Sequence, residues 1–251
     1  MRITSFNLKN GLIALSIFLI IAKTTLAQTT PARSPLRAIA STQYTAHTEL
    51  FAEFRPLLLN IPARFTAHLT QIGESFKPYT DAEVTLTLTI DGKIAWQQTQ
   101  TKPVAAGIYR FPVKAEITGT GTVTIALKMP TYSEQFIVEN VTVYADEATA
   151  LASQSKQPTD ERINEITYVK EKSWLETFAT APVSKVKKTI IVPQTAILTE
   201  NAISYVFVQN DPEHFRKQVV SLGKSKNGQI SITNGLKLGD RIVTLGADKI
   251  K

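Results

Sequence analysis

The 251-residue chain contains no cysteine, two methionines and three histidines. Without cysteine it cannot form disulfides, a thiolate zinc site, an iron–sulfur cluster or a cysteine nucleophile. Two methionines do not suffice for the thioether clusters that hold Cu(I). Motifs for a serine nucleophile elbow, a phosphate-binding loop and an HExxH zinc helix are also missing. These absences predict a protein that is not an enzyme and has no resident cofactor.

Basic residues outnumber acidic ones by 28 to 21, but the excess is partly local. Arg2, Lys9 and Lys23 fall in the first 27 residues, which leaves 25 bases against 21 acids and a net charge of +4 for the rest. The densest basic group, Lys185–Lys188, has no interleaved aromatic residue. Nucleic-acid binding requires a concentrated basic stripe, so we expect none.

Residues 1–27 have the three parts of a secretory signal peptide. Arg2 and Lys9 precede the apolar run Leu12–Ala22, and Thr25–Ala27 ends in the small residues of a cleavage site. The run is shorter than the ~20 apolar residues that a membrane-spanning helix needs. We therefore expect export to the periplasm, or a chain held at the inner membrane if the leader is not cleaved.

After a polar lead, residues 28–43, apolar and polar side chains alternate through residues 44–145. This period predicts strands that bury one face, and Asp91-Gly92 between two of them predicts a type I′ hairpin turn. Seven such strands are typical of an immunoglobulin-like β-sandwich. The predicted strands are Thr48–Phe54, Arg64–Gln71, Val84–Ile90, Lys93–Gln100, Ile108–Ala115, Thr122–Lys128 and Gln135–Tyr144.

Residues 146–165 interrupt the alternation. Asp146–Ala152 favours a short helix, and the polar stretch around Pro158 is typical of a linker, although a long surface loop inside one domain is the alternative. Residues 166–251 are again rich in short apolar runs separated by Gly and Asp, which predicts a small β-barrel or β-roll. We expect an all-β protein of two domains, with Trp174 near their junction.

The last part of the chain carries an ordered series of motifs. Val192–Ile197, Tyr205–Val208 and Ile232–Val243 look like the membrane-proximal domain of periplasmic adaptors, the HlyD-like membrane-fusion subunits of resistance-nodulation-division (RND) efflux systems. Ile166–Trp174 resembles the segment that leads into the core of heavy-metal efflux adaptors. The sandwich, with its Phe65–Thr70 motif, resembles an extra N-terminal domain of some of those adaptors.

This resemblance has one large gap. In the family, a lipoyl-like barrel-sandwich domain, usually an α-helical hairpin, and a β-barrel domain lie between the segments that correspond to those ending at Val183 and beginning at Ile190. Only Ser184–Thr189 lies there in this chain, and no long heptad pattern predicts a hairpin. The resemblance therefore implies a truncated adaptor that contacts an RND-type inner-membrane transporter or a full-length adaptor, and makes no contact with the outer-membrane channel. The oligomeric state is left open.

The three histidines are the candidate metal ligands. His68 lies opposite the apolar residues of its strand, so we expect it to face solvent. His47 precedes a neighbouring strand, and Glu49 and Glu53 supply oxygen donors, so a divalent metal ion at His47 and His68 is one hypothesis. An ordinary exposed strand histidine is the alternative, and we expect His214 to be solvated in a loop.

Together these patterns predict an accessory protein of an RND-type efflux pump, for cations or heavy metals, that acts by protein–protein contact. One alternative is a periplasmic metal-binding protein that uses His47 and His68. The other is a decayed adaptor with no activity of its own.

Overall fold

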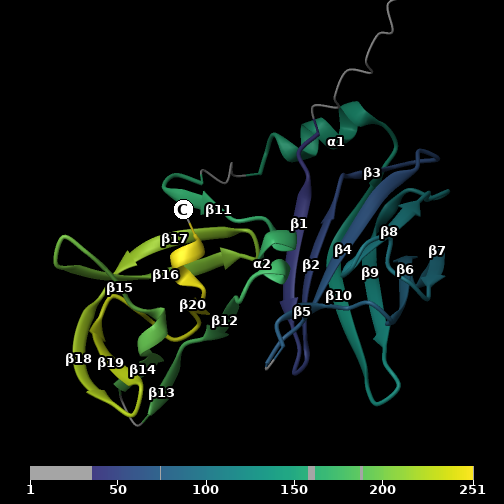
Figure 1. The fold of residues 1–251 in the computed structure, drawn as a ribbon. Coiled ribbons are helices and arrows are strands. Elements are labelled where there is room, and N and C mark those ends of the chain that lie inside the picture. Colours follow the sequence, from purple (N-terminus) through teal and green to yellow (C-terminus); the bar gives the residue numbers. More distant parts are fainter. Residues whose placement is uncertain (1–35, 74, 158–161, 187–188, 251) are drawn as a thin grey trace, which may run out of the picture. The chain divides into compact units, whose positions relative to one another are not determined.

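Alternating side chains build two β-sheets in the first part of the described chain (Figure 1). The computed structural model describes residues 36–73, 75–157, 162–186 and 189–250, so the predicted signal peptide lies outside the described residues. Sheet A contains β1 (Ile39–Tyr44), β2 (Thr48–Phe54), β4 (Ala63–Gln71), β5 (Lys77–Pro78) and β8 (Ile108–Val113). Sheet B contains β3 (Leu57–Leu58), β6 (Glu83–Ile90), β7 (Lys93–Gln100), β9 (Gly119–Lys128) and β10 (Ser133–Tyr144).

The two sheets pack their apolar faces into one core. On β6, Val84, Leu86, Leu88 and Ile90 are fully buried, and the threonines between them are half-buried. β4 pairs with β8 and β6 pairs with β9, so neighbouring strands are not consecutive in the chain. This order is that of an immunoglobulin-like sandwich, and the prediction is confirmed.

The hairpin between β6 and β7 is also confirmed. Ile90 pairs with Lys93, which leaves Asp91 and Gly92 as a two-residue loop. Both have positive φ, 49° and 74°, as a type I′ turn requires.

Two short helices follow the sandwich. α1 (Glu147–Gln154) begins after Asp146, whose carboxylate accepts a 2.7 Å hydrogen bond from the Thr149 N–H, and it was predicted. α2 (Lys170–Leu175) was not predicted, because six residues carry too little helical period to be recognised. Among the described residues, no helix has the length and apolar character needed to cross a bilayer.

The remaining chain, the C-terminal β unit (residues 165–250), forms two more sheets. They pack around Val192, Val206, Ile232 and Ile242, and the all-β prediction is confirmed. Sheet C contains β11 (Glu165–Thr167), β12 (Ala179–Pro182), β15 (Leu198–Glu200), β16 (Ile203–Asp211), β17 (His214–Val219) and β20 (Arg241–Leu245). Sheet D contains β13 (Ser184–Val186), β14 (Thr189–Pro193), β18 (Ser221–Lys226) and β19 (Gln229–Asn234), and Gln194–Ala196 and Ala247–Lys249 are 3₁₀ turns.

Two strand boundaries differ from the predictions. β1 lies where the sequence predicts only a polar lead, because an edge strand without fully buried residues shows little alternation. β16 continues to Asp211, although Asn210-Asp211-Pro212 is a sequence typical of a turn and predicts an earlier end. Gln209 is nevertheless buried and pairs with Arg241 of β20, so tertiary pairing overrides this turn preference.

Candidate functional site

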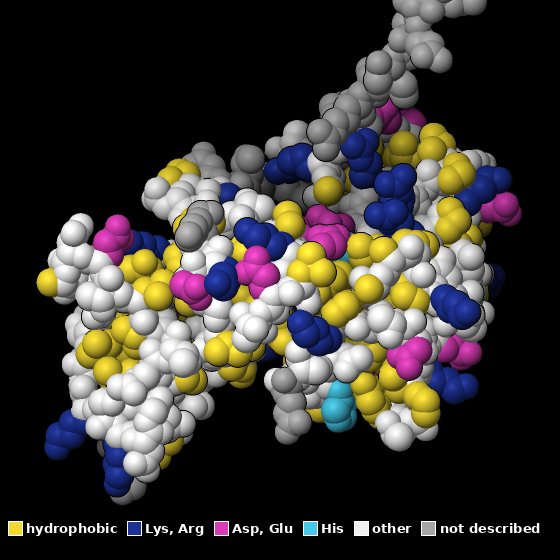
Figure 2. All heavy atoms as spheres, in the orientation of Figure 1, with side chains coloured by type: hydrophobic (Ala, Val, Ile, Leu, Met, Phe, Trp, Pro, Cys, Tyr) yellow, Lys and Arg dark blue, Asp and Glu magenta, His cyan; other side chains and the backbone are white. Residues whose placement is uncertain are grey.

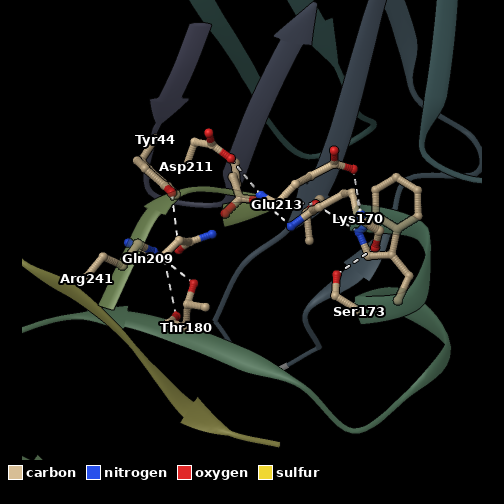
Figure 3. A network of polar contacts seen from close by, with 11 residues as sticks. Tyr44, Lys170, Ser173, Thr180, Gln209, Asp211, Glu213 and Arg241 are labelled. Atoms are coloured by element: carbon tan, nitrogen blue, oxygen red, sulfur yellow. Dashed lines mark hydrogen bonds and ion pairs between the residues drawn. The ribbon is translucent and has the colours of Figure 1, made fainter. Parts of the chain in front are cut away.

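Lys170, the first residue of α2, is fully buried against sheet A. Lysine is almost never fully buried unless it is paired. Its ammonium forms an ion pair with the equally buried Glu49 of β2 and lies 4.5 Å from the centroid of the Phe76 ring. Figure 3 shows Lys170 and Ser173 on α2 within this polar network. Burial lowers the pKa of Lys170, and the Glu49 carboxylate opposes this shift. This ion pair joins the C-terminal β unit to the outer face of the sandwich.

Trp174, one helical turn further along α2, makes the second contact with sheet A. Its indole N–H donates a 2.9 Å hydrogen bond to the Thr70 hydroxyl, and its ring meets the buried His68 ring edge-on with centroids 6.2 Å apart. Gly107, at φ +74°, lies under this ring, and a Cβ there would come within 2.6 Å of the indole. The position of the tryptophan therefore requires glycine at 107.

A third contact lies between β1 and sheet C (Figure 3). The Arg241 guanidinium of β20 stacks over the Tyr44 ring at 4.0 Å and donates a 2.9 Å hydrogen bond to the Thr180 hydroxyl. Burial, and then the Glu49 carboxylate, raise the pKa of Tyr44. We call these three contacts, Lys170–Glu49, Trp174–Thr70 and Arg241–Tyr44, the joint.

The joint overturns the expectation that His68 faces solvent. His68 lies on the outer face of sheet A, as the alternation predicts, but it is only 6 % exposed. Phe51 of the neighbouring strand and Trp174 of α2 enclose its ring. The sequence pattern of one strand cannot show that a helix from a distant segment covers that strand.

Burial of His68 makes stability depend on pH. Desolvation lowers its pKa, with Glu171 opposing the shift and Lys170 and Arg110 adding to it. The unfolded chain therefore binds this proton more readily, so stability should fall as pH drops below about 6.5, by up to about 1.4 kcal/mol per pH unit. In a His68→Gln variant this component should disappear.

The measurement is urea unfolding of both proteins from about pH 7 to pH 5.5, below the ordinary histidine pKa. Burial raises the pKa of Glu53 and Glu213. These two carboxyls therefore make stability rise as pH falls, in a pH range next to that of His68. The variant keeps both carboxyls. The difference in pH dependence of stability between the two proteins therefore gives the contribution of the His68 imidazole. Equal pH slopes would show that His68 does not titrate as its burial implies.

The structure does not bring His47 and His68 together. β2 pairs Phe51 with His68, and His47 precedes Phe51 by four residues, which corresponds to about 13 Å along a strand. His47 instead contacts Glu134 at 2.9 Å and stacks on Tyr132. No group of three or more metal-binding side chains occurs within the described ranges.

His214 and the acidic metal donors are also placed elsewhere. His214 is half-buried and its Nδ1 lies 2.8 Å from Asp211, rather than being solvated. Glu49 is committed to Lys170. Among the described residues, neither Glu49 nor Glu53 belongs to a group of three or more side chains that could hold a metal ion with the histidines.

A second candidate surface lies on the outside of the C-terminal β unit. Val219, Leu222 and Leu238 are 56 %, 39 % and 55 % exposed. Gly235, at φ +103°, lets the turn before Leu238 pack on the strand end at Val219, because a Cβ there would lie 2.3 Å from the Val219 carbonyl oxygen. We call Val219, Leu222 and Leu238 the apolar rim.

The segment that carries this rim is similar to a known domain. Residues 190–251 match the CzcB C-terminal circularly permuted SH3-like domain. The match covers the strands from β14 to β20. It supports an adaptor-type origin for the SH3-like part of the chain.

Curated relatives support the same family. Multidrug resistance protein MdtA of Salmonella typhimurium is 36 % identical over 61 residues, that of Cronobacter turicensis 34 % and that of Erwinia amylovora 33 %. Each alignment covers 24 % of this chain and 15 % of the relative, so the chain spans a small part of the relatives' length. No solved structure gives a significant match.

Sequence motifs identified the SH3-like part and placed Trp174 near the junction, but they missed the joint. Lys170 had no signal that distinguished it from the surface lysines around it. A lysine that opens a short helix two residues after the buried Tyr168 is recognisable only once its partner Glu49 is known.

Proposed function

We propose that this chain is a non-catalytic, adaptor-like component of an efflux pump. The observation that carries the proposal is the match of residues 190–251 to the SH3-like domain of an adaptor family. We further propose that it resides in the periplasm and serves an RND-type pump, for cations or heavy metals, as an accessory protein. Its partner would be the inner-membrane transporter or a full-length adaptor.

The apolar rim supports a role in protein contact. The three aliphatic side chains lie on β17, on β18 and in the turn between β19 and β20, and they are exposed while the SH3-like core is buried. Exposed apolar clusters rimmed by polar residues are typical of protein interaction sites. The rim is therefore the surface through which we propose that the partner binds.

The connection between β13 and β14 supports the shortened form of the adaptor. Ser184 pairs with Ile191 and Val186 with Thr189, so the two strands are immediate neighbours. In the family that the sequence resembles, the lipoyl-like and hairpin regions would separate these positions. A chain without them would keep the transporter contact and lose the one to the outer-membrane channel.

A capture experiment tests this proposal. The full chain, tagged, is mixed with detergent-solubilised membranes that contain an RND-type transporter with its adaptor, and the bound subunits are identified. Val219→Ser with Leu238→Ser should weaken capture about thirtyfold, since each of the two exposed aliphatic groups contributes about 1 kcal/mol at an interface.

The matched control is Ile94→Ser with Val104→Ser on the sandwich, where the side chains are 64 % and 56 % exposed. This control should bind as well as the unmodified chain. Capture of neither subunit by the unmodified chain, or equal losses in both double variants, would contradict the proposal.

A further inference from the structure

Sheet D and its flanks carry lysine as their only charged residue. Residues 183–199 and 218–239 contain six lysines, no arginine and no acidic residue. The same two segments contain no phenylalanine, tyrosine or tryptophan. Past residue 48, the rest of the chain mixes both signs of charge, so sheet D is the most one-sided electrostatic region of the part that the structure describes after β1.

The fold places these lysines at the two edges of one sheet. Lys185 lies on β13, and Lys224 and Lys226 lie on β18, the outermost strands of the order β13-β14-β19-β18. All three side chains are exposed. Figure 2 shows dark blue basic side chains, and no acidic ones, at the lower left, over the labelled strands of sheet D.

The face between these edges is neutral and carries hydroxyl groups. Ser184, Ile191 and Ser231 lie in one row across β13, β14 and β19, opposite the buried isoleucines of the core. Thr189 and Thr233 lie further along on the same face. The Ser231 and Thr233 hydroxyls donate to the Lys224 and Ser221 carbonyls, so the lysine ammonium groups are the donors that suit phosphate oxygens.

The composition of this face distinguishes between two kinds of occupant. Cores of protein interfaces are enriched in tyrosine, tryptophan and arginine and depleted of lysine, which is the reverse of what sheet D offers. Addition of a partner strand is opposed by the lysines on both edges and by the register shifts of β18. Clusters of lysine are attracted to anionic lipid surfaces.

We propose that the surface around sheet D, from Lys185 on one edge strand to Lys224 and Lys226 on the other, binds the phosphate-bearing headgroups of anionic phospholipids at a membrane surface. Val186, next to Lys185 on β13, adds an exposed apolar side chain at the same edge. This inference goes beyond the proposed efflux role, because it concerns lipid rather than a pump subunit. It would hold or fail independently of the capture experiment.

Vesicle co-sedimentation of the full chain tests the proposal. The probes are vesicles of phosphatidylcholine alone and vesicles that also contain phosphatidylglycerol. Any insertion of the apolar run Leu12–Ala22 is the same for every variant, so the comparison rests on lipid charge and on the lysines. We expect selective binding to the anionic vesicles that weakens with added NaCl.

The variant Lys185→Gln/Lys224→Gln/Lys226→Gln should reduce partitioning onto anionic vesicles on the order of 100-fold. The matched variant Lys93→Gln/Lys102→Gln/Lys156→Gln removes equal charge from exposed positions outside sheet D and should bind nearly normally. Equal binding to neutral vesicles would overturn the proposal. So would equal losses in the two triple variants, or capture of an acidic protein by sheet D without vesicle binding.

Discussion

Replacing Lys170 with methionine should lower the free energy of unfolding by about 3–5 kcal/mol. The substitution leaves the buried Glu49 carboxylate without its counter-ion, and one of its oxygens, Oε2, already has no hydrogen-bond partner among the described residues. An unpaired charge in this environment loses its hydration and gains nothing in return. Urea unfolding followed by circular dichroism measures the change.

A double variant separates the charge from the packing. Glu49→Leu with Lys170→Met replaces both charges with apolar groups of similar volume, so much of the lost stability should return. The control is Lys217→Met, which breaks the exposed pair with Glu200 and should change stability by less than about 1 kcal/mol. If Lys170→Met costs no more than Lys217→Met, the buried pair does not hold the joint.

Truncating Trp174 to alanine should also cost about 3–5 kcal/mol. The indole is 5 % exposed, packs on His68 and fills the space above Gly107. Its loss leaves a cavity and removes the hydrogen-bond donor to Thr70. The same unfolding experiment measures the cost.

The neighbouring residue supplies the control for Trp174. Leu175 follows it on α2 but is 86 % exposed, so Leu175→Ala should change stability by less than about 0.5 kcal/mol. Trp174→Phe keeps most of the ring but not the donor, and its cost should lie between the two. Similar results for Trp174→Ala and Leu175→Ala would mean that α2 does not pack on sheet A in solution.

Local sequence patterns were sufficient for the strands that alternate strongly. β2 and β7 have the predicted bounds, because turn residues or charged residues lie next to their apolar periods. β1 escaped prediction because it is an edge strand, and its Ile39 is 36 % exposed. Weak burial gives a weak pattern.

The joint could not be predicted for a different reason. Glu49 and Lys170 lie 121 residues apart, and nothing in either local segment indicates the other. The alternation of its strand correctly places His68 on the outer face of sheet A. The expected exposure was wrong, because α2 packs on that face and buries the side chain. Long-range contacts of this kind depend on the whole fold rather than on a period or a motif.

The sequence separation of that ion pair also determines the order in which the fold can form. The sandwich strands end at Tyr144, so they are complete before Lys170 has been synthesised. Until α2 arrives, Glu49, Phe51 and His68 are open to water on the outer face of sheet A. Contacts between distant residues form slowly because the intervening chain must first be ordered. Docking of α2 is therefore the last step of assembly on this face, and hydrogen exchange of the β2 and β4 amides during refolding would report it.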